Sequence, residues 1–353
     1  MEFKGIEICC PACHGELDWL DESRAELRCG GCHLQYPVVI GIPDLRLFPD
    51  PYIAADDDRT KGLKVAERFA DLDFEGLIDF YYSITSVVPA QQAQRYKRGL
   101  MAGVARAENS LTAWEQTLPS YRAGSDHSSN GEGTLLEIGC GTGPLLVAAS
   151  SKYGRVVGVD IAFRWLVVGQ KRLAEAGLDL PLICACAEAL PFPDASFDRV
   201  VADSVIEHTQ SQMDSMTEAR RVMLNSGKLY LSTPNRLSIG PDPHTGVPAG
   251  GILPEKLTAA YVRRLGGIPP KRRLLSKMTL DRLLGNCGFA PASIFLPDVA
   301  PEQRALFPAT TRRMIDLYHL LKRAPIIRHV LFLIGPLLYA VAEPSPLNDT
   351  HRN

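Results

Sequence analysis

Between residues 134 and 343 the chain alternates short apolar runs with longer amphipathic segments. Short runs bounded by Gly, Asp or Ser are typical of buried strands, whereas apolar residues that recur every three or four positions are typical of helices. The runs predict the first, second, fourth, fifth, sixth and seventh strands of a sheet at 135–138, 155–160, 197–202, 227–233, 293–296 and 337–343. Helices are predicted at 145–149 and 216–224. This alternation predicts an α/β fold with a seven-stranded, mostly parallel sheet and helices on both faces.

The residues before this alternation have a different pattern. Residues 61–119 are helical by periodicity and rich in aromatic residues. These aromatics are expected either to close over a bound molecule as a lid or to pack against the core. Tyr81 and Tyr82 are the candidate substrate contacts in this segment. Residues 120–133 are rich in Gly, Ser and Asn, a composition typical of a linker.

The first predicted strand ends in a glycine-rich turn, E-I-G-C-G-T-G-P at residues 137–144. Glycine tolerates positive φ and lets a ligand approach the backbone, and the helix that follows offers free N–H groups to an anion. A dinucleotide-binding turn has the spacing G-x-G-x-x-G, and Pro144 stands at its third glycine, which weakens an NAD or FAD interpretation. A P-loop is excluded because no Gly-Lys-Ser/Thr follows. An ordinary turn without a ligand is the remaining alternative.

The second predicted strand ends in Asp160. An acidic residue about 20 positions after the glycine turn is the usual partner of ribose hydroxyls in nucleotide-binding βαβ units. The turn and Asp160 together therefore predict a cofactor that contains a nucleoside. Asp is also a preferred N-cap residue, so Asp160 could also begin the helix that follows.

The string E-I-G-C-G-T-G resembles the first motif of class I S-adenosylmethionine (SAM)-dependent methyltransferases, of the methyltransferase type 11 kind. The segment A-E-A-L-P-F-P-D-A-S-F-D at 187–198 is similar to a second segment of the same family. The resemblance covers residues 130 to 235 and implies a Rossmann-like domain that binds SAM. It implies cofactor contacts at Glu137, Gly139, Gly141, Gly143, Asp160, Ile161, Ala187, Glu188 and Asp203.

The resemblance also suggests individual roles. Ile161 would pack on one face of the adenine. Cys186 stands where the family often has an aspartate that contacts the adenine amino group, so the backbone N–H of Ala187 or the side chain of Glu188 would replace that contact. The family places the segment 203–208 beside the transferred methyl group. His208 is therefore a candidate general base, and a structural or substrate-positioning histidine is the alternative.

Two C-x-x-C pairs, Cys10 with Cys13 and Cys29 with Cys32, lie near the beginning of the chain. Four thiolates at this spacing predict a closed, structural zinc site, and in so small a module the metal supplies folding free energy. The tail Y-P-V-V-I-G-I-P-D-L at 36–45 resembles that of the small zinc-ribbon proteins that activate RNA and translation-factor methyltransferases. A disulfide pair, or a ribbon that kept its fold without metal, are the alternatives.

These patterns divide the chain into three parts. Residues 1–48 form the predicted zinc-ribbon module, 49–133 the helical lid and linker, and 134–353 the methyltransferase core with insertions at 236–275 and 298–336. Long insertions beside a sheet predict an enclosed pocket, with His244 and Tyr261 as candidate substrate contacts. The apolar stretch 326–334 is expected to line a pocket or the surface of a homodimer, with peripheral membrane contact as the lesser alternative.

Charge and composition narrow the function further. The 353 residues include 38 Lys and Arg against 40 Asp and Glu, which gives a formal net charge of −2. Without a basic stripe, and without the N/D-P-P-Y/F motif of enzymes that methylate bases, the sequence argues against a nucleic-acid substrate. No apolar stretch is long enough to span a membrane and no signal peptide opens the chain, so a cytoplasmic location is expected.

The expected function is SAM-dependent methyl transfer to an O, N or C atom of a small-molecule, natural-product-like biosynthetic substrate. The zinc ribbon suggests one alternative, a methyltransferase that acts on RNA or a translation factor. A SAM-binding protein that transfers no methyl group is the other. The sequence contains no motif that identifies the acceptor.

Overall fold

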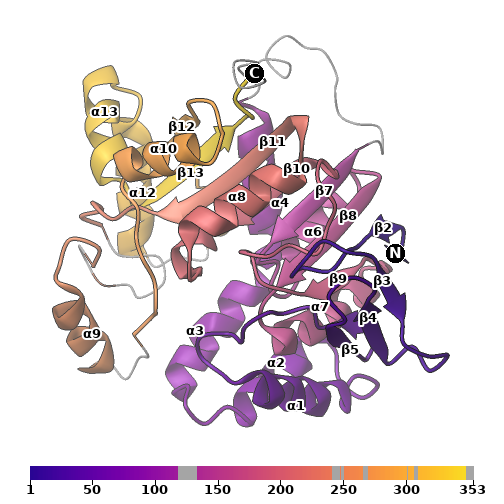
Figure 1. The fold of residues 1–353 in the computed structure, drawn as a ribbon. Coiled ribbons are helices and arrows are strands. Elements are labelled where there is room, and N and C mark those ends of the chain that lie inside the picture. The colour runs from indigo at the N-terminus through magenta and orange to yellow at the C-terminus, as the bar shows by residue number, and fades with distance from the viewer. Residues whose placement is uncertain are drawn as a thin grey trace.

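A central seven-stranded sheet organises the computed structural model, which describes residues 1–117, 133–240, 247, 250–264, 269–299, 301–305 and 309–346 (Figure 1). The strand order is β12-β13-β11-β10-β7-β8-β9, and β13 is antiparallel to both of its neighbours while the other pairs are parallel. The predicted seven-stranded, mostly parallel sheet is confirmed. The strands are β7 (Thr134–Ile138), β8 (Arg155–Asp160), β9 (Leu182–Cys184), β10 (Phe197–Asp203), β11 (Met223–Pro234), β12 (Ser293–Phe295) and β13 (Leu337–Ala342).

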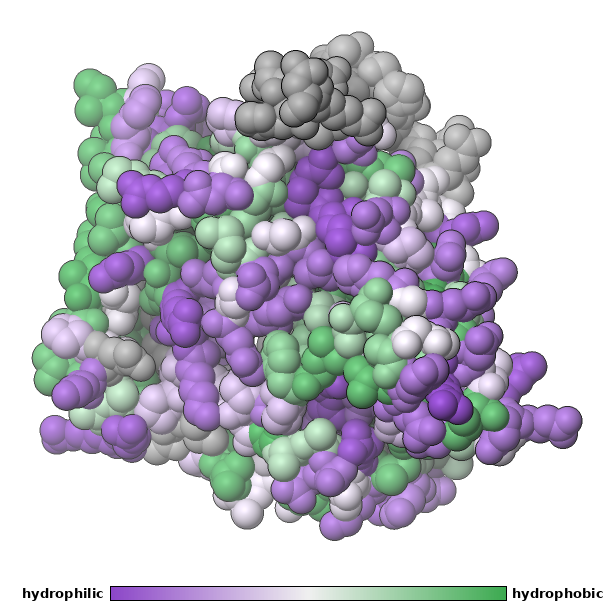
Figure 2. All heavy atoms as spheres, viewed as in Figure 1, coloured by the Kyte–Doolittle hydropathy of each residue, from purple (hydrophilic) through white to green (hydrophobic). Residues whose placement is uncertain are grey.

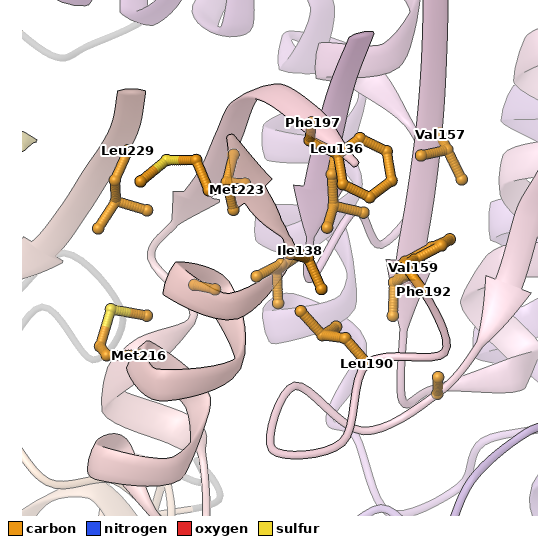
Figure 3. Packing of buried hydrophobic residues seen from close by; sticks show 14 of the residues in the cluster. Leu136, Ile138, Val157, Val159, Leu190, Phe192, Phe197, Met216, Met223 and Leu229 are labelled. Atoms are coloured by element: carbon orange, nitrogen blue, oxygen red, sulfur yellow. The ribbon is translucent and has the colours of Figure 1, made fainter. Parts of the chain in front are cut away.

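Alternate residues of the central strands enter two separate cores. In Figure 3, Leu136 and Ile138 of β7 and Val159 of β8 reach the same core, in which they lie near Leu190. Leu135, the residue directly before Leu136 in β7, belongs to the core on the other face. This alternation follows from the two-residue period of a strand, and it explains why the apolar runs are continuous rather than alternating: both faces are buried.

Helices cover both faces of the sheet, as predicted. The core on one face includes residues of α8 (Gln212–Val222) and α10 (Lys277–Asn286). The core on the other face includes residues of α4 (Gly103–Glu115), α6 (Pro144–Ala149) and α7 (Phe163–Glu175). Helices α1 (Ala55–Ala66) and α2 (Phe74–Ser83) pack on α7, and α3 (Ala90–Met101) packs on α2. Part of the predicted lid therefore covers the sheet: Trp114 of α4 is fully buried and donates its indole N–H to the carbonyl of Leu231 (3.3 Å).

The N-terminal module consists of short strands and is joined to the large sheet. A hairpin of β1 (Glu2–Phe3) and β2 (Ile6–Glu7) precedes an antiparallel sheet of β3 (Leu17–Trp19), β4 (Glu26–Cys29), β5 (Gln35–Val39) and β6 (Ile42–Pro43). Directly after β6, Asp44 forms a parallel bridge with Cys184 of β9, and the N–H of Leu45 donates to the Cys184 carbonyl (2.7 Å). The N–H of Cys9 donates to the carbonyl of Pro191 (3.0 Å). The module thus extends the edge of the sheet at β9.

The remaining elements are η1 (Ile206–His208), α9 (Glu255–Arg264), α11 (Pro301–Ala305), α12 (Ala309–Leu321) and α13 (Pro325–Ile334). The helix expected at 216–224 ends at Val222, because Met223 already pairs with Phe197 as the start of β11. All but Gly133 of the predicted linker at 120–133 lies outside the described residues. Among the described residues, no helix is both long and apolar enough to cross a bilayer.

Candidate cofactor site and metal centre

The four predicted metal-binding cysteines meet in one cluster. The Sγ atoms of Cys10, Cys13, Cys29 and Cys32 all lie within 4.8 Å of one another. The Cys10–Cys32 and Cys13–Cys29 Sγ distances are 3.6 and 3.4 Å. A tetrahedral zinc ion with Zn–S bonds of about 2.3 Å requires S···S distances near 3.8 Å, whereas a disulfide requires about 2.0 Å. The cysteines are free thiols, so the disulfide alternative is wrong, and the donor set fits structural zinc.

The surroundings of Cys29 favour a thiolate. The backbone N–H of Cys32 donates to Sγ of Cys29 (3.4 Å), and the Tyr36 hydroxyl lies 3.1 Å from Sγ of Cys10. Burial raises the pKa of the Cys29 thiol, but hydrogen bonds from Cys32, Cys13 and Gly31 outweigh burial and lower that pKa to about 6. A Cβ on Gly15 would lie only 3.2 Å from the sulfurs of Cys13 and Cys29, so a larger side chain there would crowd the cluster.

The glycine turn adopts the conformation that its residues suggest. Gly139, Gly141 and Gly143 have φ values of 72°, 51° and 70°, all in the left-handed region that glycine accepts without strain. A Cβ on Gly139 would lie 2.2 Å from the Val205 side chain, so the turn packs closely against the segment after β10. Pro144 occupies the start of α6, where its missing N–H costs no helix hydrogen bond.

Three predicted acidic residues stand at the carboxyl ends of adjacent strands: Glu137 near the end of β7, Asp160 at the end of β8 and Asp203 at the end of β10. Glu137 is 4% exposed, and its Oε2 has no hydrogen-bond partner among the described residues. Burial, together with Asp203 and Asp160, raises the pKa of Glu137 well above its ordinary value. Burial also raises the pKa of Asp160 to about 6 and, with Glu207, that of Asp203. A bound cation would relieve this repulsion, as the sulfonium and ammonium groups of SAM would.

Asp160 does not cap the following helix. Its Oδ2 accepts from the N–H of Gly141 (2.8 Å) and its Oδ1 from that of Ala162 (2.7 Å), which ties the glycine turn to the end of β8. The first N–H groups of α7 are instead satisfied by Asp58, which accepts from Phe163 (2.8 Å) and Arg164 (3.3 Å). Asp58 lies on α1, so the cap comes from a distant part of the sequence. An ordinary N-cap residue directly precedes its helix in the sequence, so the cap of α7 by Asp58 could not be predicted from the sequence.

A buried ion cluster connects the N-terminal module to this loop. Asp58 accepts from the guanidinium groups of Arg46 (2.8 Å) and Arg164 (2.8 Å). Arg46 also pairs with Asp44 (2.6 Å) and donates to the carbonyl of Ile161 (3.0 Å). Arg164 pairs in addition with Asp50 (3.0 Å). Ile161, which is predicted to pack on adenine, is therefore held by Arg46 of the N-terminal module.

The loop after β9 is held by backbone and side-chain contacts. Glu188 accepts through Oε1 from the N–H groups of Gln210 (2.6 Å) and Ser211 (3.2 Å), so its carboxylate orders the segment after η1. Cys186 is buried and donates its thiol to the carbonyl of Phe48 (3.5 Å). Ala187 is half-buried beside it. Contacts of Ala187 and Glu188 with adenine remain predictions.

His208 lies at the end of η1, close to a buried carboxylate. Its Nε2 is 4.0 Å from Oε1 of Glu207, and its Nδ1 is 3.3 Å from the carbonyl of Lys271. Glu207 is fully buried and accepts from the Thr233 hydroxyl (3.0 Å). A histidine whose Nδ1 donates to a carbonyl has Nε2 as its basic nitrogen. The role of His208 as a general base stays a prediction.

The described candidate substrate contacts lie on two helices, α2 and α9. Tyr81 is buried, its ring packs against Trp165 with centroids 4.4 Å apart, and its hydroxyl accepts from Arg164 (3.3 Å), so it supports the ion cluster. Tyr82 is half-buried and stacks on Tyr96. Tyr261 is exposed on α9. His244 lies outside the described residues.

Two segments of the chain match known families. Residues 136–231 match the family described as "Methyltransferase domain", and residues 8–41 match the family described as "Trm112p-like protein". The first match contains the glycine turn, and all three acidic residues at the strand ends lie inside it. The second contains all four clustered cysteines.

Similar proteins match the same core. A ubiquinone/menaquinone biosynthesis C-methyltransferase, UbiE, of Bordetella avium is 39% identical over 100 residues, which cover 28% of this chain and 39% of that protein. A ubiquinone biosynthesis O-methyltransferase of Idiomarina loihiensis is 31% identical over 103 residues, which cover 29% and 42%. The chain thus spans about two fifths of the length of these relatives. A crystal structure of an S-adenosylmethionine-dependent methyltransferase from Mesorhizobium loti covers 65% of this chain and 95% of its own, with 17% identity and a TM-score of 0.44.

Proposed function

We propose that this chain, in which a methyltransferase domain follows a Trm112p-like domain, binds SAM and transfers its methyl group to a small molecule. The observation that carries the proposal is the set of acidic side chains at the carboxyl ends of β7, β8 and β10, around the glycine turn. Ligands of open α/β sheets bind at this edge. A partly buried group of carboxylates suits a cationic cofactor, whereas it would repel the pyrophosphate of a dinucleotide.

Different residues at this edge would contact different parts of SAM. Asp160 would accept hydrogen bonds from the ribose hydroxyls, and Ile161 would pack on the adenine. The glycine turn would approach the methionine part, with Glu137 and Asp203 near its positive charges. Bound SAM supplies an electrophilic methyl group, and the protein contributes orientation and exclusion of water around it.

A small biosynthetic acceptor is the substrate class that we favour. The relatives named above are a C-methyltransferase of ubiquinone and menaquinone biosynthesis and an O-methyltransferase of ubiquinone biosynthesis, which are pathways of small molecules. The Trm112p-like domain supports a second candidate, methylation of an RNA or a translation factor. Incubating the protein with SAM labelled in its methyl group and with fractionated extract separates the two: label in the small-molecule fraction supports the first, and label in RNA or protein supports the second. Binding of SAM without any labelled product would support the third interpretation, a SAM-binding protein.

Replacing Asp160 by Ala tests the cofactor assignment. Loss of charged hydrogen bonds to the ribose costs about 1.5–3 kcal/mol, so the SAM dissociation constant should rise roughly 10–150-fold. Asp71→Ala is the matched control, because Asp71 is exposed and its ion pair with Arg68 lies at the surface. Calorimetric titration with SAM and with NAD measures both effects. Equal SAM affinity in the Asp160→Ala variant and the wild type would remove Asp160 from the site, and binding of NAD instead of SAM would overturn the proposal.

The affinity for SAM is expected to fall below about pH 6. Burial raises the pKa of Asp160 to about 6, and the pKa values of Glu137 and Asp203 are raised as well, so acid protonates these groups and removes the negative charge that the cofactor needs. The loss should approach about tenfold per pH unit below that value. Titrations between pH 5 and 7.5 would measure it.

The loss of SAM affinity below pH 6 is not expected to come from acid unfolding. A carboxyl group whose pKa is raised in the folded state stabilises the SAM-free protein at low pH, and this stabilisation is lost as the pH rises through that pKa. Asp44 behaves in the opposite way, because Arg46 and Arg59 outweigh burial and lower its pKa, so its stabilisation disappears only in stronger acid. A SAM affinity that stays constant from pH 7.5 to 5 would contradict the assigned role of the three carboxylates.

A further inference from the structure

Two of the helices between β12 and β13, α12 and α13, expose many apolar side chains. Neither α12 nor α13 has a buried residue. Along α12 the exposed apolar residues recur every three positions, and along α13 they recur at helical spacing. The exposed large apolar residues are Met314, Leu317, Leu320, Ile326, Ile327, Val330 and Leu333. Figure 2 shows hydrophobic residues gathered along the edge of the molecule where Figure 1 places these helices. Patches of this kind mark interaction surfaces.

Hydrogen bonds and an ion pair attach α12 to the segment after β12. They involve residues on the side of α12 that faces away from its exposed apolar row, so that row stays exposed in the folded protein. The Tyr318 hydroxyl donates to the carbonyl of Pro297 (2.8 Å), and His319 Nε2 accepts from the N–H of Val299 (3.1 Å). Lys322 pairs with Asp298 (2.6 Å). These anchors turn Met314, Leu317 and Leu320 outward.

Positive charge surrounds the apolar rows. Residues 309–334 contain five Arg and Lys and one acidic residue, Asp316, which gives a formal charge of +4 in a chain whose total is −2. Asp316 is itself paired with Arg304. No described acidic side chain forms an ion pair with Arg313, Arg323 or Arg328. Apolar side chains with a basic surround are typical of helices that lie in the headgroup region of anionic membranes.

We propose that α12 and α13 form a docking surface for an anionic lipid bilayer. A second copy of the chain fits less well, because a twofold dimer through this face would bring two surfaces of the same positive charge together. The helices lie on the bilayer and do not cross it: α13 has ten residues and is about 15 Å long, half of a hydrocarbon core of about 30 Å.

This surface is continuous with the cofactor edge of the sheet. The carbonyl of Leu333 on α13 accepts from Asn235 Nδ2 (2.9 Å), and the carbonyl of Pro336 accepts from the Asn235 N–H (3.0 Å). Asn235 directly follows β11, whose Ser232 donates to Asp203. An apolar acceptor dissolved in the bilayer would therefore reach the site beside the membrane. This last step rests on the proposed function, whereas lipid binding does not.

Sedimentation of the full-length protein with vesicles tests the docking surface. The wild type should sediment with vesicles that contain phosphatidylglycerol and at least about tenfold less with pure phosphatidylcholine, and high salt should release it. Ile326→Asp with Val330→Asp, which places two acids on the apolar row of α13, should reduce binding at least about tenfold. Val87→Asp, an equally exposed apolar position between α2 and α3, should bind like the wild type.

The SAM affinity of each variant is measured in parallel. Unchanged affinity shows that the variants fold, and it separates failure of the docking surface from failure of the proposed function. Absence of wild-type binding, or equal binding to both kinds of vesicle, would overturn the proposal. So would a wild-type dimer that the double substitution converts to a monomer, because the face would then belong to a second copy.

Discussion

Replacing Asp58 by Ala lowers the free energy of unfolding by about 3–5 kcal/mol, the expected cost of breaking a buried ion pair by removing one partner. The Asp58 side chain is completely buried, and its loss leaves the guanidinium groups of Arg46 and Arg164 without their shared carboxylate. It also removes the cap of α7, an effect of about 1 kcal/mol in helices generally. Urea unfolding followed by circular dichroism measures the change.

Two further variants sharpen this experiment. Asp57→Ala changes the neighbouring exposed acid on the same helix and should stay within about 0.5 kcal/mol of the wild type. Asp58→Asn keeps the shape and one acceptor, so it separates loss of charge from loss of the cap. Since Arg46 also holds the carbonyl of Ile161, Asp58→Ala should weaken SAM binding as well. A stability within about 1 kcal/mol of the wild type would mean that the ion cluster contributes little.

Removal of the metal unfolds the N-terminal module. Structural zinc contributes an apparent 10–16 kcal/mol in small zinc-finger peptides, far more than the apolar surface of so short a segment. Cys29→Ser should therefore abolish zinc retention and add an early thermal transition. Because Leu45 is fully buried and its N–H bonds to Cys184, the melting temperature of the core should fall as well.

Cys9→Ser is the matched control for the metal experiment. Cys9 is a buried cysteine next to the cluster, but its sulfur is not one of the four that meet there. It should keep the zinc content of the wild type, as measured by elemental analysis of the purified protein. Unfolding traces of the Cys29→Ser variant that match the wild type would show that the module folds without metal.

The sequence could predict the sheet because its strands are buried on both faces and therefore read as apolar runs between turn residues. It could predict the glycine turn and the four cysteines because these depend on spacing within short segments. The ion cluster was not predictable in this way. Asp58 and Phe163 are far apart in the sequence, and an acidic residue on a helix usually faces solvent. Tyr81 shows the same limit: its sequence context allowed either a substrate contact or packing against the core. In the structure its buried ring packs against Trp165 and its hydroxyl accepts from Arg164.

The bridge between Asp44 and Cys184 also determines an order of assembly on the ribosome. The hydrogen-bond partner of Leu45, Cys184, is synthesised about 140 residues after it. At about 5–20 residues per second the first segment waits roughly 7–28 s for its docking site. During that interval Ile42 and Leu45, both buried in the finished protein, have no sheet to cover them. Early zinc capture by the nascent chain would keep this segment folded until the rest of the sheet is made.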